Sequence, residues 1–156
     1  MIEPKEPIDK IDRKILNLLQ KDASLTQREL AQQVGLSQNA CWRRLQILRA
    51  NEVIKGQTVR LEPAELGLGL TVFVMIRTRH HSVEWLENFR YEVLAIPNVI
   101  DMYRIAGDYD YILKVIAADM NGFDRVYQRL ISKVELESVT SMITMESIAC
   151  GRDLPL

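Results

Sequence analysis

The sequence has little of what a metal centre needs. Its two cysteines, Cys41 and Cys150, are far apart, and neither has a second cysteine or a histidine at zinc-ligand spacing. Its two histidines, His80 and His81, are adjacent, so they cannot both face one site on a strand or a helix. We therefore expect no metal site and no cofactor, and we expect Cys41 to be a free, buried thiol.

Long apolar runs are also missing, since no stretch approaches the roughly 18 apolar residues that a membrane span needs. The first 15 residues differ from a signal peptide because they contain four acids, Glu3, Glu6, Asp9 and Asp12. We expect a cytoplasmic protein with no membrane partner. A glycine-rich phosphate loop and a nucleophile beside a general base are absent too, so we do not expect an enzyme.

Charge is unevenly distributed along the 156 residues. Residues 1–56 hold ten Lys and Arg against seven Asp and Glu, whereas residues 57–156 hold ten against fourteen. A chain of this length forms one domain or two small ones. The change of sign favours two modules, of which the first faces a polyanion.

Three short helices are predicted in the first domain, residues 1–56. Apolar residues recur at helical spacing after Asp9, after Thr26 and after Ser37, and each of these three is suited to cap a helix N-terminus. Gly35 supplies the tight turn between the second and third helices. Two helices joined by a short glycine-containing turn form a helix-turn-helix unit, and the first helix completes its core.

A linker is predicted at residues 57–69, starting with a short strand at 57–61 and containing the turn residues Pro63 and Gly67. The second domain, residues 70–156, has apolar segments in the order β-α-β-β-α-β, with strands expected at 70–78, 100–105, 109–117 and 139–149. That order predicts an α+β fold of the ferredoxin-like type, a four-stranded antiparallel sheet with both helices on one face.

The segment VGLSQNACWRRLQILRA, residues 34–50, carries three arginines and no acid. A helix docked against DNA phosphates loses binding energy with every carboxylate it carries, which accounts for the missing acids. Residues near the start of a recognition helix reach base edges, and we expect Ser37, Gln38, Asn39 and Arg43 to do so. Phosphate contacts are expected from Thr26, Gln27, Arg49 and Lys55.

Two residues of this segment have more than one interpretation. Arg44 is a candidate DNA contact, but it could instead pair with Asp12 across the helical core. Trp42 could press against the DNA backbone, or it could belong to the core or to an interface.

The stretch IDKIDRKILNLLQKDASLTQRELAQQVGLSQNACWRRLQILRANEVIKG resembles the helix-turn-helix of the Lrp/AsnC, or feast/famine, transcriptional regulators. The later stretch AGDYDYILKV resembles the Gly-Asp-Tyr/Phe-Asp-Tyr motif of that family's amino-acid-binding domain. The similarity covers nearly the whole chain, with both modules in the same order. Among the departures, many members carry proline where this chain has Gln38 and Ala40, and glycine where it has Glu52.

The resemblance implies a sequence-specific regulator of double-stranded DNA, built from homodimers that assemble further into octamers. It also implies an amino-acid effector bound at residues 107–110, between subunits and close to the last strand. Backbone N–H groups at such a turn suit a carboxylate, and a nearby carboxylate suits an ammonium group. The candidate effector residues are Gly107, Asp108, Tyr109, Asp110, Met120, Thr140 and Met142.

The alternative for residues 107–110 is a plain hairpin turn in which aspartate bonds its own backbone. The sheet domain would then only oligomerise, and the chain would be a DNA-binding or architectural protein without a small-molecule effector.

Overall fold

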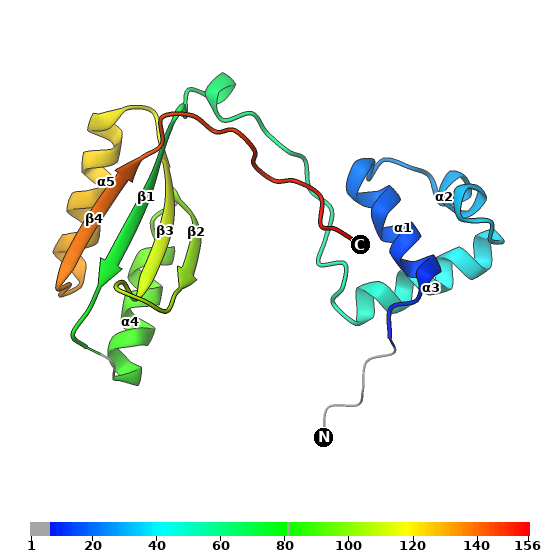
Figure 1. Cartoon of the computed structure of the whole chain (residues 1–156), viewed down its shortest axis with the longest axis horizontal. Helices are drawn as coiled ribbons and strands as arrows, with labels where there is room; N and C mark the ends of the chain where they lie inside the picture. Colours follow the sequence, from blue (N-terminus) through cyan, green and yellow to red (C-terminus); the bar gives the residue numbers. More distant parts are fainter. Residues whose placement is uncertain (1–6, 81) are drawn as a thin grey trace. The chain divides into compact units, whose positions relative to one another are not determined.

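The computed structural model describes residues 7–80 and 82–156, and these divide into two compact units (Figure 1). The helical unit comprises the chain up to Arg60 together with Ala149–Leu156, and the sheet unit comprises Leu61–Ile148. Glu3, Glu6 and His81, which entered the sequence argument, lie outside the described residues. Within the described residues, no helix is both long and apolar enough to cross a membrane.

The helical unit contains α1 (Lys10–Lys21), α2 (Gln27–Val34) and α3 (Gln38–Ala50). Each helix begins at the residue immediately after its predicted cap. The cap side chain accepts hydrogen bonds from first-turn amides that have no partner within the helix. The caps are Asp9, Thr26 and Ser37.

The core of the helical unit is made of apolar residues from all three helices. Cys41, Leu45 and Leu48 of α3 are buried against residues of α1 and α2 such as Ile15 and Leu30. The expectation of a free, buried Cys41 is therefore confirmed, and burial raises the pKa of its thiol. The helix-turn-helix unit, and the contribution of α1 to its core, agree with the prediction from the sequence.

The sheet unit contains four strands in the spatial order β2-β3-β1-β4, and every neighbouring pair is antiparallel. The predicted β-α-β-β-α-β order and the α+β, ferredoxin-like fold are confirmed. In chain order the elements are β1 (Leu70–Arg77), α4 (Val83–Leu94), β2 (Val99–Arg104), β3 (Tyr111–Ala117), α5 (Met120–Lys133) and β4 (Ser138–Ile143).

The two faces of this sheet differ. Strand residues alternate between faces, and the buried residues of β1, Val72, Val74 and Ile76, share a core with Phe89 of α4 and with α5. The other face, to which Phe73 belongs, is not covered by α4 or α5 and is called the open face below.

Two predicted strands differ from the structure. Residues 57–61 do not form a strand, and the linker contains a short 3-10 helix, Ala64–Leu66, instead. The last strand ends at Ile143 and not at residue 149, because β1 begins at Leu70 and β4 runs out of partner residues just beyond it. A strand requires a neighbour for its N–H and C=O groups, and a single sequence does not reveal where that neighbour stops.

The C-terminal residues are also placed differently. The sequence assigns them to the domain 70–156, whereas Ala149–Leu156 packs with the helical unit. The boundaries at 56/57 and 69/70 stay predictions.

Candidate functional site

The exposed face of α3 lies opposite its buried face and carries polar, basic and aromatic side chains. Asn39 and Arg43 are four residues apart, so they are neighbours on this face, and both are exposed. Trp42 is 52% exposed on the same side, so it is not a core residue. The helix carries no carboxylate, and Arg49 in its last turn extends the basic character. The sequence therefore predicted the composition of this face correctly.

The start of α3 is held by hydrogen bonds to neighbouring groups. Ser37 Oγ accepts a bond from the backbone N–H of Ala40 at 3.2 Å. Gln27 Nε2 donates to the backbone carbonyl of Gln38 at 3.0 Å, which ties the first turn of α2 to the first turn of α3. Gln27 was predicted only as a phosphate contact, and its bridging role could not be read from the sequence because it depends on how two helices meet.

Thr26 is also occupied within the protein. Its backbone N–H and its hydroxyl both donate to Glu29 Oε2, at 2.8 and 2.7 Å. These bonds stabilise the carboxylate form, so the pKa of Glu29 is lowered, with the Thr26 hydroxyl as the largest cause. Thr26 therefore fixes the start of α2, and its expected contact with phosphate stays a prediction.

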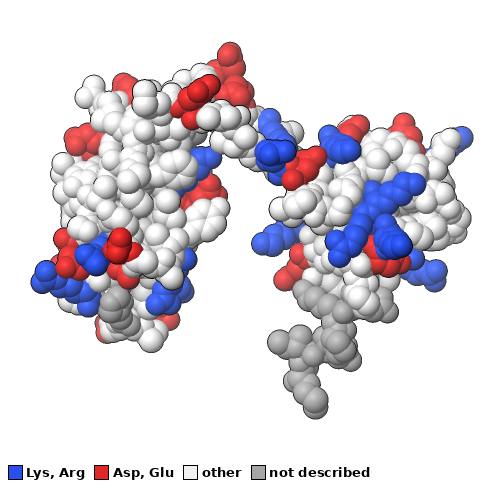
Figure 2. Space-filling model, in the orientation of Figure 1, with Lys and Arg blue, Asp and Glu red and all other residues white. Residues whose placement is uncertain are grey.

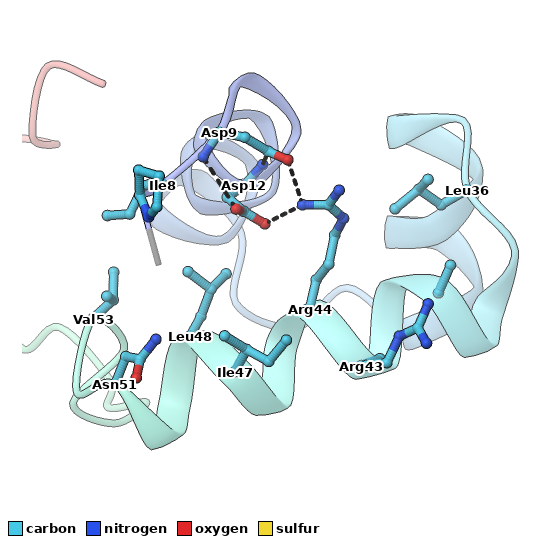
Figure 3. A pocket seen from close by; sticks show the side chains of 12 residues that line it. Ile8, Asp9, Asp12, Leu36, Arg43, Arg44, Ile47, Leu48, Asn51 and Val53 are labelled. Carbon is cyan, nitrogen blue, oxygen red and sulfur yellow. Dashed lines mark hydrogen bonds and ion pairs between the residues drawn. The ribbon is translucent and has the colours of Figure 1, made fainter. Parts of the chain in front are cut away.

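Arg44 points from α3 toward the start of α1 (Figure 3). Its guanidinium donates to Asp12 Oδ1 at 2.9 Å and to Asp9 Oδ2 at 2.7 Å. The pairing with Asp12 that the sequence left open is confirmed, and Asp9 is a second partner that the sequence argument missed. The spacing of two acids three residues apart at a helix start was the available signal.

This ion pair changes the acidity of Asp9. The pKa of Asp9 is lowered, chiefly by the hydrogen bond from the backbone N–H of Asp12 and then by the bond from Arg44. The pair borders a groove of about 580 Å³ that is walled partly by Ile8, Ile47 and Val53 (Figure 3). Arg44 thus braces α1 against α3, and its expected contact with DNA stays a prediction.

Basic side chains gather on the surface of the helical unit that Figure 2 shows. Arg43 and Arg49 are exposed on α3, and Lys55 is exposed just beyond the helix. A surface of this kind attracts a polyanion and orients it by contacts to phosphate.

The predicted effector turn, residues 107–110, joins β2 to β3 at one end of the sheet. Gly107 has φ +138°, a backbone conformation that favours glycine. Asp110 Oδ2 accepts a bond from the backbone N–H of Thr78 at 2.8 Å, which fastens the turn to the end of β1. Asp110 therefore has a structural partner, whereas Asp108 lies exposed at the tip.

Two other predicted effector residues do lie near this turn. The hydroxyl of Tyr109 donates to Thr140 Oγ1 at 3.3 Å, so the turn reaches across the end of β1 to β4. Thr140 pairs with Met75, and Met142 follows two residues later on the same face. The structure thus brings together Tyr109, Thr140 and the open face on which Met142 lies.

Met120 does not join this group within one chain. It begins α5, directly after β3 has carried the chain away from the turn through seven residues. A strand of that length spans about 20 Å. Since the effector site is expected between subunits, the part of Met120 in it stays a prediction.

The open face of the sheet is apolar and accessible. Strand register places Phe73 of β1 opposite Met142 of β4, and Tyr103 of β2 opposite Ile112 of β3. Phe73 is 36% exposed, Met142 is 52% exposed and Tyr103 is 58% exposed. Lys114 of β3 lies beside Phe73 on the same face, so the face combines apolar and charged side chains. Exposed apolar side chains gathered on one face of a small domain are typical of a protein–protein interface.

Both parts of the chain match domain families of known proteins. Residues 8–55 match a winged helix-turn-helix DNA-binding domain, and residues 71–154 match the Lrp/AsnC ligand binding domain. The glutamate uptake regulatory protein of Zymomonas mobilis is 48% identical over 149 residues, which cover 96% of this chain and 91% of that protein.

Solved structures give the same result. An AsnC family transcriptional regulator from Agrobacterium tumefaciens has a TM-score of 0.90 at 43% identity, covering 94% of this chain and 96% of that one. A transcriptional regulator from Neisseria meningitidis, solved as a complex with L-Met, has a TM-score of 0.88 at 31% identity, covering 96% and 97%. The chain therefore belongs to the Lrp/AsnC family of DNA-binding transcriptional regulators.

Proposed function

We propose that the chain recognises specific double-stranded DNA sites with the exposed face of α3. The observation that carries this proposal is the pair Asn39 and Arg43, adjacent and exposed on a helix without a carboxylate. Asn and Gln form paired hydrogen bonds with adenine, and Arg does so with guanine. Gln38 and Ser37 extend the reading surface at the helix N-terminus. The chain acts by binding rather than by catalysis, in the cytoplasm where its DNA lies.

Other residues orient the helix on the duplex. Arg49 and Lys55 are exposed and basic, and they contact phosphates without reading sequence. Gln27 is exposed and holds α3 through the Gln38 carbonyl. Arg44 acts mainly by holding α1 against α3.

Two copies of the chain bind DNA together as a homodimer, and dimers assemble further toward an octamer. The open face supports this, because Phe73, Met142 and Tyr103 lie exposed together on one face of the sheet that neither helix covers. Pairing of two open faces would remove this apolar surface from water. A dimer presents two copies of α3 to successive half-sites, about one DNA turn apart, and so reads twice the sequence.

An amino acid bound near residues 107–110 regulates this assembly. The Neisseria relative, which was solved with L-Met, supports an amino-acid ligand. Asp108 is exposed and suits an ammonium group, and the Tyr109–Thr140 hydrogen bond lies beside it at the edge of the open face. A ligand there changes DNA binding only if it binds one assembly state more tightly than another.

The DNA proposal is tested by selecting fragments of genomic DNA on the purified protein and sequencing them. We expect enrichment of a two-fold symmetric motif with half-sites about one turn apart. Asn39→Ala and Arg43→Ala should lose this enrichment, whereas Arg13→Ala, an exposed arginine of α1, should keep it. Enrichment of the same motif by all three variants would overturn the assignment of α3.

The effector proposal is tested by thermal melting of the full chain with each of the twenty amino acids. A selective rise in Tm shows a binding site, because a ligand that binds only the folded state stabilises it. We expect Asp108→Asn to abolish that rise, with Asp124→Asn on α5 as the control. If no amino acid raises Tm, the second candidate function, an oligomeric DNA-binding protein without an effector, replaces it.

A further inference from the structure

The last residues of the chain bind to α1 through the side-chain amides of that helix. The backbone N–H of Leu154 donates to Gln20 Oε1 at 2.6 Å, and Gln20 Nε2 donates to the carbonyl of Leu154 at 3.2 Å. One glutamine thus satisfies both backbone groups of one residue, as a neighbouring strand would. One turn earlier on the same helix, Asn17 Nδ2 donates to the backbone oxygen of Leu156 at 3.3 Å.

The C-terminal residues form one wall of a groove on the helical unit. The groove has a volume of about 500 Å³ and is walled by Leu16 and Leu19 of α1 and by the segment 53–58. Leu154 and Leu156 form part of its lining. Beside it, Asp153 makes an ion pair with Arg60 at 3.4 Å. The contacts combine backbone recognition, apolar lining and opposite charge over four consecutive residues, 153–156.

The docked C-terminal residues add a second connection between the two units. The polypeptide passes from the helical unit to the sheet unit after Arg60, and it returns to the helical unit at Ala149. The helical unit is therefore attached to the sheet unit by two segments of chain. The second attachment depends on non-covalent contacts, each of which is weak, but docking within one chain has a high effective concentration.

We propose that residues 152–156 are a latch for the DNA-binding unit, held on α1 by the side-chain amides of Gln20 and Asn17. With the latch closed, two tethers restrict the orientations of the helix-turn-helix relative to its dimer partner. With the latch open, a single linker of residues 61–69 remains and permits more orientations. The docking of the latch does not depend on the proposed function. Only the expected effect of the latch on the spacing of DNA half-sites rests on that function.

Docking is tested by hydrogen exchange of the full chain, followed by mass spectrometry of the C-terminal peptide 149–156. Gln20→Ala removes both hydrogen bonds to Leu154 and should accelerate deuterium uptake by this peptide at least about fivefold, the factor expected for loss of one such bond. Gln33→Ala, an exposed glutamine of α2 outside the groove, should leave the uptake unchanged. Equal uptake in Gln20→Ala and the unchanged protein would overturn the latch.

The restraint on orientation is tested with a chain that ends at Gly151. Its binding is compared on a selected operator and on the same operator with about five base pairs, half a DNA turn, inserted between half-sites. The full chain should discriminate strongly between them, and the shortened chain should discriminate at least about threefold less. If the shortened chain discriminates equally, the latch does not restrict orientation. If the full chain binds neither DNA, the proposed function fails, while the exchange result stands by itself.

Discussion

At the end of α3, a single residue adopts a left-handed backbone conformation that glycine would tolerate better. Glu52 has φ +57°, and it follows the cap residue Asn51. Its N–H donates to the carbonyl of Arg49, and the N–H of Val53 donates to that of Leu48, both at 2.9 Å. This is the pattern of a helix C-terminus at which glycine is usual, and the family resemblance also favours glycine here.

Replacing Glu52 with glycine should stabilise the helical unit. A non-glycine residue at positive φ costs roughly 1 kcal/mol, and part of the gain is offset because glycine has more freedom in the unfolded chain. We expect the free energy of unfolding to rise by about 0.5 kcal/mol, measured by urea denaturation. Glu52→Ala, which removes the same carboxylate but keeps Cβ, should give no such gain. A gain of equal size with alanine would show that charge, and not backbone strain, is responsible.

Asp9 gives a pH-dependent prediction. Its pKa is lowered in the folded protein, chiefly by the Asp12 N–H and then by Arg44. The stabilisation is therefore fully present above the unfolded pKa, about 4, and is lost as pH falls through the folded value. Asp9→Asn keeps a good helix cap but removes the charge. It should destabilise the protein at pH 7 and cost progressively less stability below about pH 4.

The measurement is urea denaturation of both proteins across pH 7 to pH 3, with Asp153→Asn as a second carboxylate variant. A stability difference between the original protein and Asp9→Asn that grows on acidification would contradict the account of Asp9.

At the scale of elements, the turn between α2 and α3 sets how the recognition helix is presented. Gly35 has φ +73°, and its N–H donates to the carbonyl of Gln32 at 3.3 Å. A Cβ at this position meets no atom within 4 Å, so any cost of adding one comes from the backbone conformation alone.

Gly35→Ala should therefore lower the free energy of unfolding by about 1 kcal/mol. Gly56→Ala is the matched control, because its added Cβ also meets open space and its φ lies outside the left-handed range. It should leave stability unchanged or raise it slightly. Thermal melting of both variants checks this, and an equal loss at both positions would argue against the backbone explanation.

The helices could be predicted from sequence better than the site in the sheet unit. The caps Asp9, Thr26 and Ser37 act on residues two or three positions away, so a short stretch contains the whole signal. The Tyr109–Thr140 bond joins residues 31 positions apart, and it depends on the register of three strands. The sequence located the turn and β4 but did not show which of the candidate residues meet.

The same reasoning explains the misplaced elements. Residues 57–61 have strand-like composition, but strand formation requires a partner that composition does not supply. Met120 lies at the far end of β3 from the turn, and whether it meets the turn of a second subunit is not determined by the sequence of one chain. The C-terminal residues could not be assigned to the helical unit, because Gln20 and Leu154 are 134 positions apart.

At the scale of the whole molecule, the open face of the sheet should hold two copies of the chain together. Phe73→Glu removes a large apolar side chain from the middle of that face and adds a carboxylate beside Lys114, so the dimer would have to bury charge there. We expect dimer dissociation to become easier by about a hundredfold, with a parallel loss of operator affinity. Sedimentation equilibrium measures the first and fluorescence anisotropy the second.

Tyr91→Glu is the control for this change. Tyr91 lies on α4 and is 73% exposed, so it is an aromatic residue even more accessible than Phe73 and away from the open face. It should leave the mass in solution unchanged. If Phe73→Glu also leaves the mass unchanged, the open face is not the dimer surface.

The central claim is that the exposed face of α3 reads bases, and the most direct test compares specific with non-specific binding. Anisotropy titrations of Arg43→Ala and Arg13→Ala would use a selected operator and a scrambled duplex over a range of salt concentrations. We predict that Arg43→Ala loses about 10- to 100-fold in the ratio of the two affinities, as expected for one bidentate base contact. Arg13→Ala should keep that ratio. An Arg43→Ala protein that weakens equally on both duplexes, or on neither, would contradict the account.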